Sequence, residues 1–157
     1  MSALRKRRVM RRKDARDLME EAGILLEDAQ PNIVEQAELE GTTVYLIDGN
    51  PILAREGGTL YPTLNSPNLD RLPSVVVDMG AVPYVCDGAD IMAPGIVEVQ
   101  GEFEEGGLVV VRDVRHGKAL AVGRALTSSS GLGAMEKGRG ITNLHYVGDS
   151  LWQATAE

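Results

Sequence analysis

The first regular pattern of apolar positions lies near the N-terminus, in residues 12–22. Apolar side chains recur there at i, i+3, i+4 and i+7, namely at Ala15, Leu18, Met19 and Ala22. This spacing places them on one face of an α-helix, and the following Gly23 is typical of a helix end. The pattern predicts an amphipathic helix over residues 12–22. The preceding segment, LRKRRVM, is compatible with a short strand or with an unstructured arm.

Strand patterns begin after Pro31. Residues 43–47 and 52–55 are two strand-forming runs separated by Asp-Gly-Asn-Pro, and Asp-Gly suits a tight reversal with positive φ. We therefore expect a β-hairpin. The segment NIVEQAELE, residues 32–40, can pair with it as a third strand. Together with the predicted helix, these strands indicate an α+β unit.

Glycine and proline interrupt this pattern in the middle of the chain. Gly57-Gly58 and the proline-rich segment 61–74 break its regularity, so we expect an irregular junction between a domain of residues 1–72 and one of residues 73–157. Short apolar runs then alternate with glycine turns, which favours a small β-barrel or sandwich. The expected strands lie within residues 74–79, 91–99, 108–114, 118–127 and 141–147, with a helix-like insert at 128–136.

The composition bounds the class of protein. The chain of 157 residues is 43% apolar, which suffices for a buried core without disulfides or metal. The single cysteine, Cys86, excludes a disulfide within the chain and suits a reducing cytosol. No apolar run approaches the length of about 18 residues that a membrane span requires. We therefore expect a cytoplasmic protein that does not act in a membrane.

Charge is distributed unevenly along the chain. The formal net charge is -7, yet residues 1–16 hold eight Lys or Arg against one Asp, a local +7. Residues 17–157 hold the other 22 acids and eight bases, or -14. Such a protein can hold an anionic partner at one place and repel it elsewhere. The acidic body suits a salty cytoplasm, or reflects compositional drift.

Candidate catalytic groups do not form a recognisable set. Cys86, His116 and His145 are isolated in the sequence, which is not the spacing of a metal site. Residues 128–133, SSSGLG, lack the G-x-S-x-G elbow and are better interpreted as a capped helix N-terminus. The glycine-rich segment 131–140 matches no phosphate-loop motif. The sequence therefore predicts a protein that is not an enzyme.

A binding surface is the remaining candidate. Gly80, Gly88 and Gly95 recur around a short apolar segment, and glycines let another backbone approach closely. Their N–H groups can meet phosphates or base edges, as in the recognition of single-stranded RNA. Apolar contact would come from Ile91 and Met92, and positive charge from Arg124, Lys137 and Arg139. The alternative is that these glycines only let a short helix pack against a strand.

Three separated blocks resemble a known family. The pattern Gly80-Ala81, Gly88-Ala89, Ile91 and Gly95 resembles the opening of the PUA domain, a small RNA-binding pseudo-barrel. The segment KGRGITNLHYVGDSLW and the combination REG-x-x-YPTL are similar to the malignant T-cell amplified sequence family, its archaeal relatives and the ligatin-type initiation factor. The resemblance covers roughly residues 43–153.

This resemblance implies a fold and a site. The fold is α+β, with an N-terminal α+β pre-PUA domain, residues 1–72, packed on a C-terminal PUA β pseudo-barrel with short helices, residues 73–157. The implied function is RNA binding without catalysis, cofactor or metal. The RNA-binding residues would be Gly80, Ala81, Tyr84, Gly88, Ala89, Ile91, Met92, Pro94, Gly95, Arg124, Lys137, Arg139 and Gly140.

The chain departs from the PUA pattern in its charge. Many PUA domains carry a basic residue between the two Gly-Ala pairs, whereas residues 81–87, AVPYVCD, contain none. The phosphate contact then falls to Arg124, Arg139 or the basic N-terminal segment. That segment is a possible RNA contact or a solvated face, and its candidate residues are Arg5, Lys6, Arg7, Arg8, Arg11 and Arg12.

The family points to translation. We expect binding to the tRNA acceptor end or to small-subunit rRNA, with the small ribosomal subunit and a translation-factor protein as partners, in initiation or ribosome recycling. Two other classes stay open. One is an accessory RNA-binding subunit of a tRNA- or rRNA-modifying enzyme. The other is a protein–protein adaptor with a vestigial RNA surface, which the absence of a basic residue from segment 81–87 favours.

Overall fold

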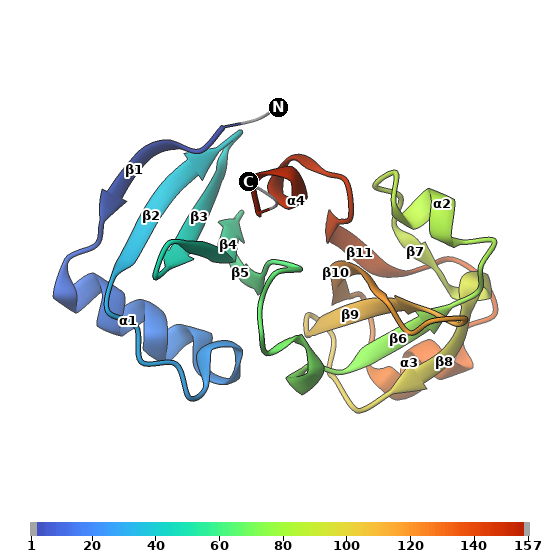
Figure 1. Ribbon diagram of the computed structural model, residues 1–157. Helices are drawn as coiled ribbons and strands as arrows, with labels where there is room; N and C mark the ends of the chain where they lie inside the picture. The colour runs from blue at the N-terminus through green and yellow to red at the C-terminus, as the bar shows by residue number, and fades with distance from the viewer. Residues whose placement is uncertain (1–2, 156–157) are drawn as a thin grey trace. The chain divides into compact units, whose positions relative to one another are not determined.

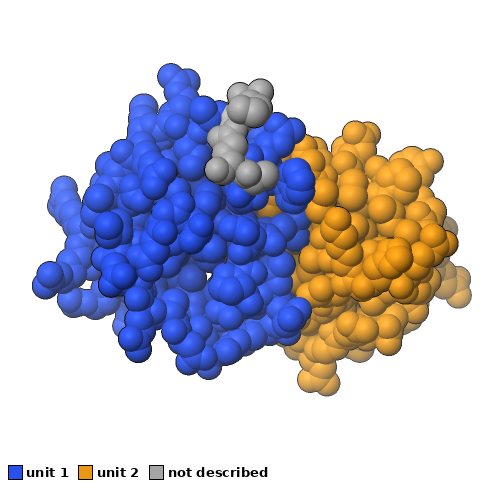
Figure 2. Space-filling view, viewed as in Figure 1, with its two compact units in different colours: residues 1–71, 150–157 blue, residues 72–149 orange. Residues whose placement is uncertain are grey.

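The computed structural model describes residues 3–155, which divide into two compact units (Figures 1 and 2). Unit 1 comprises the chain up to Arg71 together with the segment from Ser150 onwards, and unit 2 comprises Leu72–Asp149. The division falls beside the expected junction. The C-terminal segment, however, groups with unit 1, whereas the sequence placed it in the second domain.

Unit 1 is built on an antiparallel five-stranded sheet with the order β1-β2-β3-β4-β5. Its strands are β1 (Arg5–Val9), β2 (Val34–Leu39), β3 (Thr42–Ile47), β4 (Asn50–Glu56) and β5 (Thr59–Pro62). Its helices are α1 (Arg12–Ala22), the 3₁₀ helices η1 (Gly23–Leu26) and η2 (Leu69–Arg71), and α4 (Ser150–Thr155).

The first predicted elements of this unit are confirmed. The amphipathic helix is α1, which buries Leu18 and Ala22 and ends at Gly23 with a positive φ of 50°. The basic segment before it is the strand β1, which decides between the two interpretations of the sequence. The hairpin between β3 and β4 turns at Asp48 and Gly49, both with positive φ, as its Asp-Gly dipeptide predicts.

One prediction for unit 1 is wrong. The segment after Gly57-Gly58 was expected to be irregular, yet Thr59–Pro62 forms β5, whose Thr59 pairs with Glu56. The two glycines have positive φ and form the turn of a second hairpin. Pro62 is tolerated because β5 is the last strand of the sheet, where one edge requires no N–H donor.

Unit 2 is a curled six-stranded sheet with the order β7-β11-β10-β9-β6-β8. Neighbouring strands are antiparallel except β6 and β9, which are parallel. The two edge strands, β7 and β8, are consecutive in the chain and joined by one 3₁₀ turn, so the sheet must curl to bring its edges together. The strands are β6 (Ser74–Val77), β7 (Ile91–Met92), β8 (Ile96–Gln100), β9 (Leu108–Asp113), β10 (Ala119–Ala125) and β11 (Arg139–Tyr146). The helices are α2 (Val82–Val85), η3 (Ala93–Gly95) and α3 (Ser129–Ala134).

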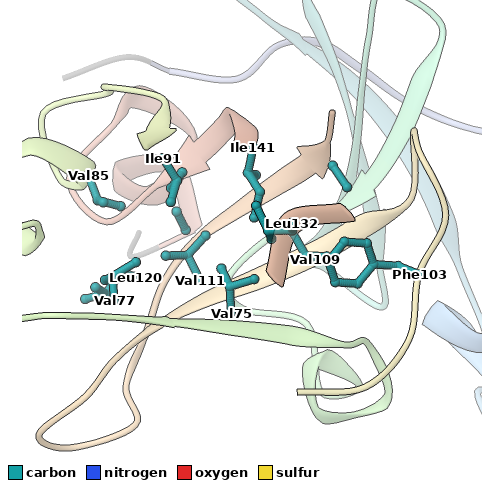
Figure 3. Close-up of a cluster of buried hydrophobic side chains, with 12 residues drawn as sticks. Val75, Val77, Val85, Ile91, Phe103, Val109, Val111, Leu120, Leu132 and Ile141 are labelled. Atoms are coloured by element: carbon teal, nitrogen blue, oxygen red, sulfur yellow. The ribbon is translucent and has the colours of Figure 1, made fainter. Parts of the chain in front are cut away.

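The core of unit 2 lies inside this curl (Figure 3). Valines of β6 and β9, together with Ile91 and Ile141, pack against Leu132 of α3 and form one buried cluster. The predicted strands and the helix-like insert are therefore confirmed, except that the expected strand 91–99 is divided by η3 into two strands, β7 and β8. Ser128 caps α3, because its Oγ accepts a hydrogen bond from the N–H of Gly131 at 3.1 Å.

The buried carboxylate of Asp113 in unit 2 makes the stability of the fold depend on pH. Asp113 accepts hydrogen bonds from the backbone N–H groups of His116 and Lys118 at 2.5 and 3.2 Å, and the first of these is the main reason that its pKa is lowered. A carboxyl with a lowered pKa stabilises the fold above its unfolded pKa of about 3.9, and this stabilisation is lost as the pH falls through the folded pKa. We expect Asp113→Asn to lower the Tm at pH 7 and to flatten the acid limb of the stability curve.

Thermal unfolding between about pH 2 and 7 measures this effect. Asp87→Asn is the control, because Asp87 is an exposed aspartate of the same unit. Equal pH dependence in the Asp113→Asn variant and the unmodified chain would show that the loop between β9 and β10 does not depend on this carboxylate.

Candidate nucleic-acid interface

The first Gly-Ala pair forms a tight turn between β6 and α2. Asp78 follows β6, and its Oδ1 accepts a hydrogen bond from the N–H of Ala81 at 2.9 Å. Pro83 lies in the first turn of α2, where its missing N–H leaves no hydrogen bond unmade. The helix has only one turn, and Gly88, with φ at 95°, reverses the chain after it. This local sequence therefore presents α2 as a short projection from the sheet.

Gly95 allows a close approach between η3 and the start of α2. A Cβ at Gly95 would lie 3.3 Å from the Cβ of Ala81, and the N–H of Asp78 donates to the carbonyl oxygen of Gly95 at 2.9 Å. A larger side chain at either position would push the two segments apart. The packing interpretation therefore holds for Gly95, which also lines the surface described next.

A hollow of about 540 Å³ lies between α2, the segment of β7 and η3, and the start of β11. We call it the PUA hollow. Nine of the predicted residues line it: Gly80, Ala81, Tyr84, Ala89, Ile91, Met92, Pro94, Gly95 and Arg139. Asp78, Val85 and Asp90 line it as well and were not predicted. Residues far apart in the sequence therefore meet here, because β7 pairs with β11 and places Met92 opposite Arg139.

The PUA hollow combines a buried apolar floor with an exposed aromatic ring. Ile91 and Val85 are buried in the floor, and Met92 is exposed. Tyr84 on α2 is 70% exposed, although tyrosine rings in folded proteins usually bury much of their surface. A flat ring beside an apolar surface is the arrangement on which an unstacked base can stack.

Positive charge at the PUA hollow comes from Arg139 alone among its lining residues. Its side chain is 65% exposed, and a guanidinium nitrogen lies 3.2 Å from Oδ2 of Asp90. Because Asp78 also lines the hollow, the carboxylates outnumber the cations. Segment 81–87, which contains no basic residue, therefore has a structural counterpart, which is a largely apolar hollow with one exposed cation, Arg139.

Four predicted residues do not line the hollow. A Cβ at Gly88 would lie 3.1 Å from the Tyr146 ring, and one at Gly140 would lie 2.4 Å from Cδ1 of Leu132. Because they have no side chain, these two glycines allow Tyr146 and Leu132 to pack closely against the backbone. Arg124 is exposed on β10, and Lys137 is exposed just before β11.

Asn143 on β11 holds the rim of the hollow in place, and the sequence did not single it out. Its Nδ2 donates to the carbonyl oxygens of Val85 and Ala89, each at 3.0 Å. Its backbone N–H donates to Oδ1 of Asp90 at 2.9 Å. One side chain thus fixes the end of α2, and the carboxylate that pairs with Arg139 is fixed by the same residue. The sequence contains no signal that distinguishes Asn143 from other polar residues of β11, such as Thr142 and His145.

The basic N-terminal residues lie in unit 1, on β1 and at the start of α1. Arg7 pairs with Glu35 of β2 at 2.9 Å, and Lys6 lies 3.6 Å from Glu38. Within residues 3–155, the remaining predicted residues, Arg5, Arg8, Arg11 and Arg12, form no ion pair or side-chain hydrogen bond. Part of the predicted basic contact is therefore neutralised by β2.

Other chemistry in the described chain is limited. No group of three or more His, Cys, Asp or Glu in residues 3–155 is arranged to hold a metal ion. Burial raises the pKa of the Cys86 thiol, which disfavours a reactive thiolate. His145 is buried and its Nδ1 contacts the Asp149 carboxylate at 2.9 Å. No helix within these residues is long and apolar enough to cross a membrane.

The curled sheet, with its hollow between α2 and η3, defines a PUA domain, and the family model described as "PUA domain" matches residues 73–147. An uncharacterized protein of Methanocaldococcus jannaschii is 36% identical over 95% of this chain and 96% of its own length. Translation machinery-associated protein 20 of Saccharomyces cerevisiae is 30% identical over 73% of this chain and 67% of its own length. Malignant T-cell-amplified sequence 1-B of Xenopus laevis is 33% identical over 72% of this chain and 66% of its own length. The chain belongs to this family of translation machinery-associated and malignant T-cell-amplified sequence proteins.

Solved structures agree with the fold. A PUA-domain protein of Aeropyrum pernix, crystallised as a tartrate complex, superposes with a TM-score of 0.83 at 28% identity and covers 97% of this chain and 91% of its own. A hypothetical protein of Pyrococcus horikoshii superposes with a TM-score of 0.81 at 27% identity and covers 95% of this chain and 99% of its own. The predicted family and α+β fold with a PUA pseudo-barrel are thereby confirmed.

Proposed function

We propose that this chain is a non-catalytic RNA-binding protein of the translation apparatus. In this proposal, the PUA hollow holds an unpaired nucleotide of tRNA or of small-subunit rRNA, and the protein acts in the cytoplasm during initiation or ribosome recycling. The observation that carries the proposal is the exposed Tyr84 ring beside an apolar hollow with Arg139 at its rim. The names of the relatives, which refer to the translation machinery, support the cellular setting.

The charges of the hollow suggest which part of a nucleotide enters it. The carboxylates of Asp78 and Asp90 line it and repel phosphate, whereas they do not repel a neutral base. The base would therefore stack on Tyr84 with its apolar face toward Met92, and the phosphate would remain at the rim beside Arg139. Arg139 can turn from Asp90 to a phosphate at small cost, because an exposed ion pair contributes only about 0–1 kcal/mol.

Removal of Arg139 tests this arrangement. We expect Arg139→Ala to weaken binding of tRNA or small-subunit rRNA by about fivefold, since one exposed phosphate contact contributes about 1 kcal/mol. The slope of log affinity against log salt should also become shallower by about 0.7, the value for one phosphate contact on a single strand. Fluorescence anisotropy across a salt series measures both quantities.

Arg115→Ala is the matched control, because Arg115 is an exposed arginine of unit 2 that does not line the hollow. It should leave the salt slope unchanged. Salt-insensitive binding, or equal slopes in Arg139→Ala and the unmodified chain, would contradict a phosphate contact at the rim.

A further inference from the structure

Unit 1 contains a groove that the proposed RNA contact does not use. It has a volume of about 370 Å³ and lies between the end of β1, one face of α1 and the segment that precedes β2. Figure 1 shows the short bend that joins β1 to α1. Its lining includes Val9, Met19 and Ile33 as apolar surface, and Arg12 and Arg16 as cations. We call it the arginine groove.

The cations of the arginine groove are not neutralised within the described chain. Arg12 and Arg16 are four residues apart, so both lie on the helix face that lines the groove. Neither forms an ion pair within residues 3–155, in contrast to Lys6 and Arg7 on β1. The acids of α1 (Asp14, Asp17, Glu20 and Glu21) do not line the groove. Positive charge is thus concentrated there in a chain whose formal net charge is -7.

The apolar lining of the groove is accessible. Val9 is 63% exposed and Ile33 is 49% exposed, although most large apolar residues of unit 1 are buried. No aromatic side chain lines the groove, so it offers no platform on which a base could stack. Apolar side chains and two arginines in one groove instead match a peptide that carries both apolar and acidic side chains, since guanidinium groups bind carboxylates in bidentate geometry.

We propose that the arginine groove binds an acidic segment of a partner protein, which inserts an apolar side chain between Val9 and Ile33 and places carboxylates on Arg12 and Arg16. The strand β1 adds a second element to this surface. Among the strands of residues 3–155 it pairs only with β2, and it therefore leaves one backbone edge available to an extended segment. This interaction is independent of the RNA contact in unit 2.

The test is an unbiased selection followed by affinity measurements. A library of random 12-residue peptides displayed on phage is selected on the full chain and counter-selected on the Arg16→Glu variant. We expect the surviving sequences to combine Asp or Glu with Leu, Ile, Val or Met. Synthetic copies of these peptides, labelled with fluorescein, should lose at least tenfold in affinity with Arg16→Glu and several-fold with Ile33→Ser.

Lys13→Glu is a closely matched control. Lys13 is exposed on the same helix and does not line the groove, and its substitution changes the net charge as Arg16→Glu does. Each substitution also places an acid four residues before another acid, Asp17 or Glu20, so the small effect on helix stability is shared. We expect Lys13→Glu to change peptide affinity by less than twofold. Circular dichroism verifies that both variants are folded.

Several results would overturn the proposal. One is selection of peptides that lack acidic residues, or of no peptide at all. Another is equal loss of affinity with Arg16→Glu and Lys13→Glu, which would indicate attraction by overall charge. If Arg16→Glu weakens RNA binding and leaves peptide binding intact, the groove is a nucleic-acid contact. If the unmodified chain dimerises in sedimentation and Arg16→Glu abolishes the dimer, its occupant is a second copy.

Discussion

Replacement of Tyr84 by alanine is expected to weaken RNA binding by about fivefold to 150-fold. Stacking of one base on an aromatic side chain contributes about 1–3 kcal/mol, and each 1.4 kcal/mol corresponds to about tenfold in affinity. Because the Tyr84 ring is exposed and not part of the core of unit 2, its removal should leave the free energy of unfolding nearly unchanged. Anisotropy titrations at one salt concentration measure the affinity, and thermal unfolding measures the stability.

Two variants separate stacking from other causes. Tyr84→Phe keeps the ring and should bind RNA within about twofold of the unmodified chain, since stacking does not require the hydroxyl. Trp152→Ala removes an exposed aromatic side chain of unit 1 and should not affect RNA affinity. Undiminished RNA binding by Tyr84→Ala would contradict the stacking role of the PUA hollow.

Substitution of Gly123 by alanine should have the largest effect on stability. A Cβ at this position of β10 would lie 2.4 Å from Cγ2 of Ile141 and 2.7 Å from the carbonyl oxygen of Thr142, both on β11. One of these atoms belongs to the backbone, so the strands must separate to accept the methyl group. Overpacking of this kind costs about 1–3 kcal/mol. For a unit of this size we expect the Tm to fall by about 4–24 °C.

Gly133→Ala provides the opposite case in the same unit. Gly133 lies in α3, and a Cβ there would meet no atom within 4 Å. Alanine should therefore stabilise the unit by about 0.5–1 kcal/mol, because it reduces the freedom of the unfolded chain and favours helix. Calorimetry measures both variants. A Gly123→Ala protein as stable as Gly133→Ala would show that β10 and β11 do not pack as described.

The parts of the fold that the sequence predicts are those whose signals are local. The helix α1 follows from four apolar residues at helical spacing and a terminal glycine. The β3–β4 hairpin follows from Asp48-Gly49. The strand β5 was missed because Gly57-Gly58 and Pro62 resemble breaks in structure. Only the position of β5 at the sheet edge makes that proline acceptable, and an edge position is not local information.

The residues of the candidate site were likewise predicted where the sequence signal is local. Nine of the twelve residues that line the PUA hollow are among those that the resemblance to PUA domains implies, because short-range motifs carry that resemblance. Asp90 and Asn143 were missed, since their roles depend on contacts across the sheet. Asp78 was missed although its hydrogen bond with Ala81 is local. The glycines of the predicted site also have different structural roles. Gly80 and Gly95 line the hollow, whereas Gly88 and Gly140 make room for Tyr146 and Leu132.

Photo-crosslinking tests the central claim, that RNA occupies the PUA hollow, most directly. Transcripts of tRNA and of small-subunit rRNA carrying 4-thiouridine are irradiated with the full chain, and the crosslinked residues are mapped by mass spectrometry. We predict crosslinks within residues 78–95, centred on Tyr84 and Met92, that disappear in the Tyr84→Ala variant. Crosslinks confined to β1 and α1, or none above those of an unrelated acidic protein, would contradict the claim.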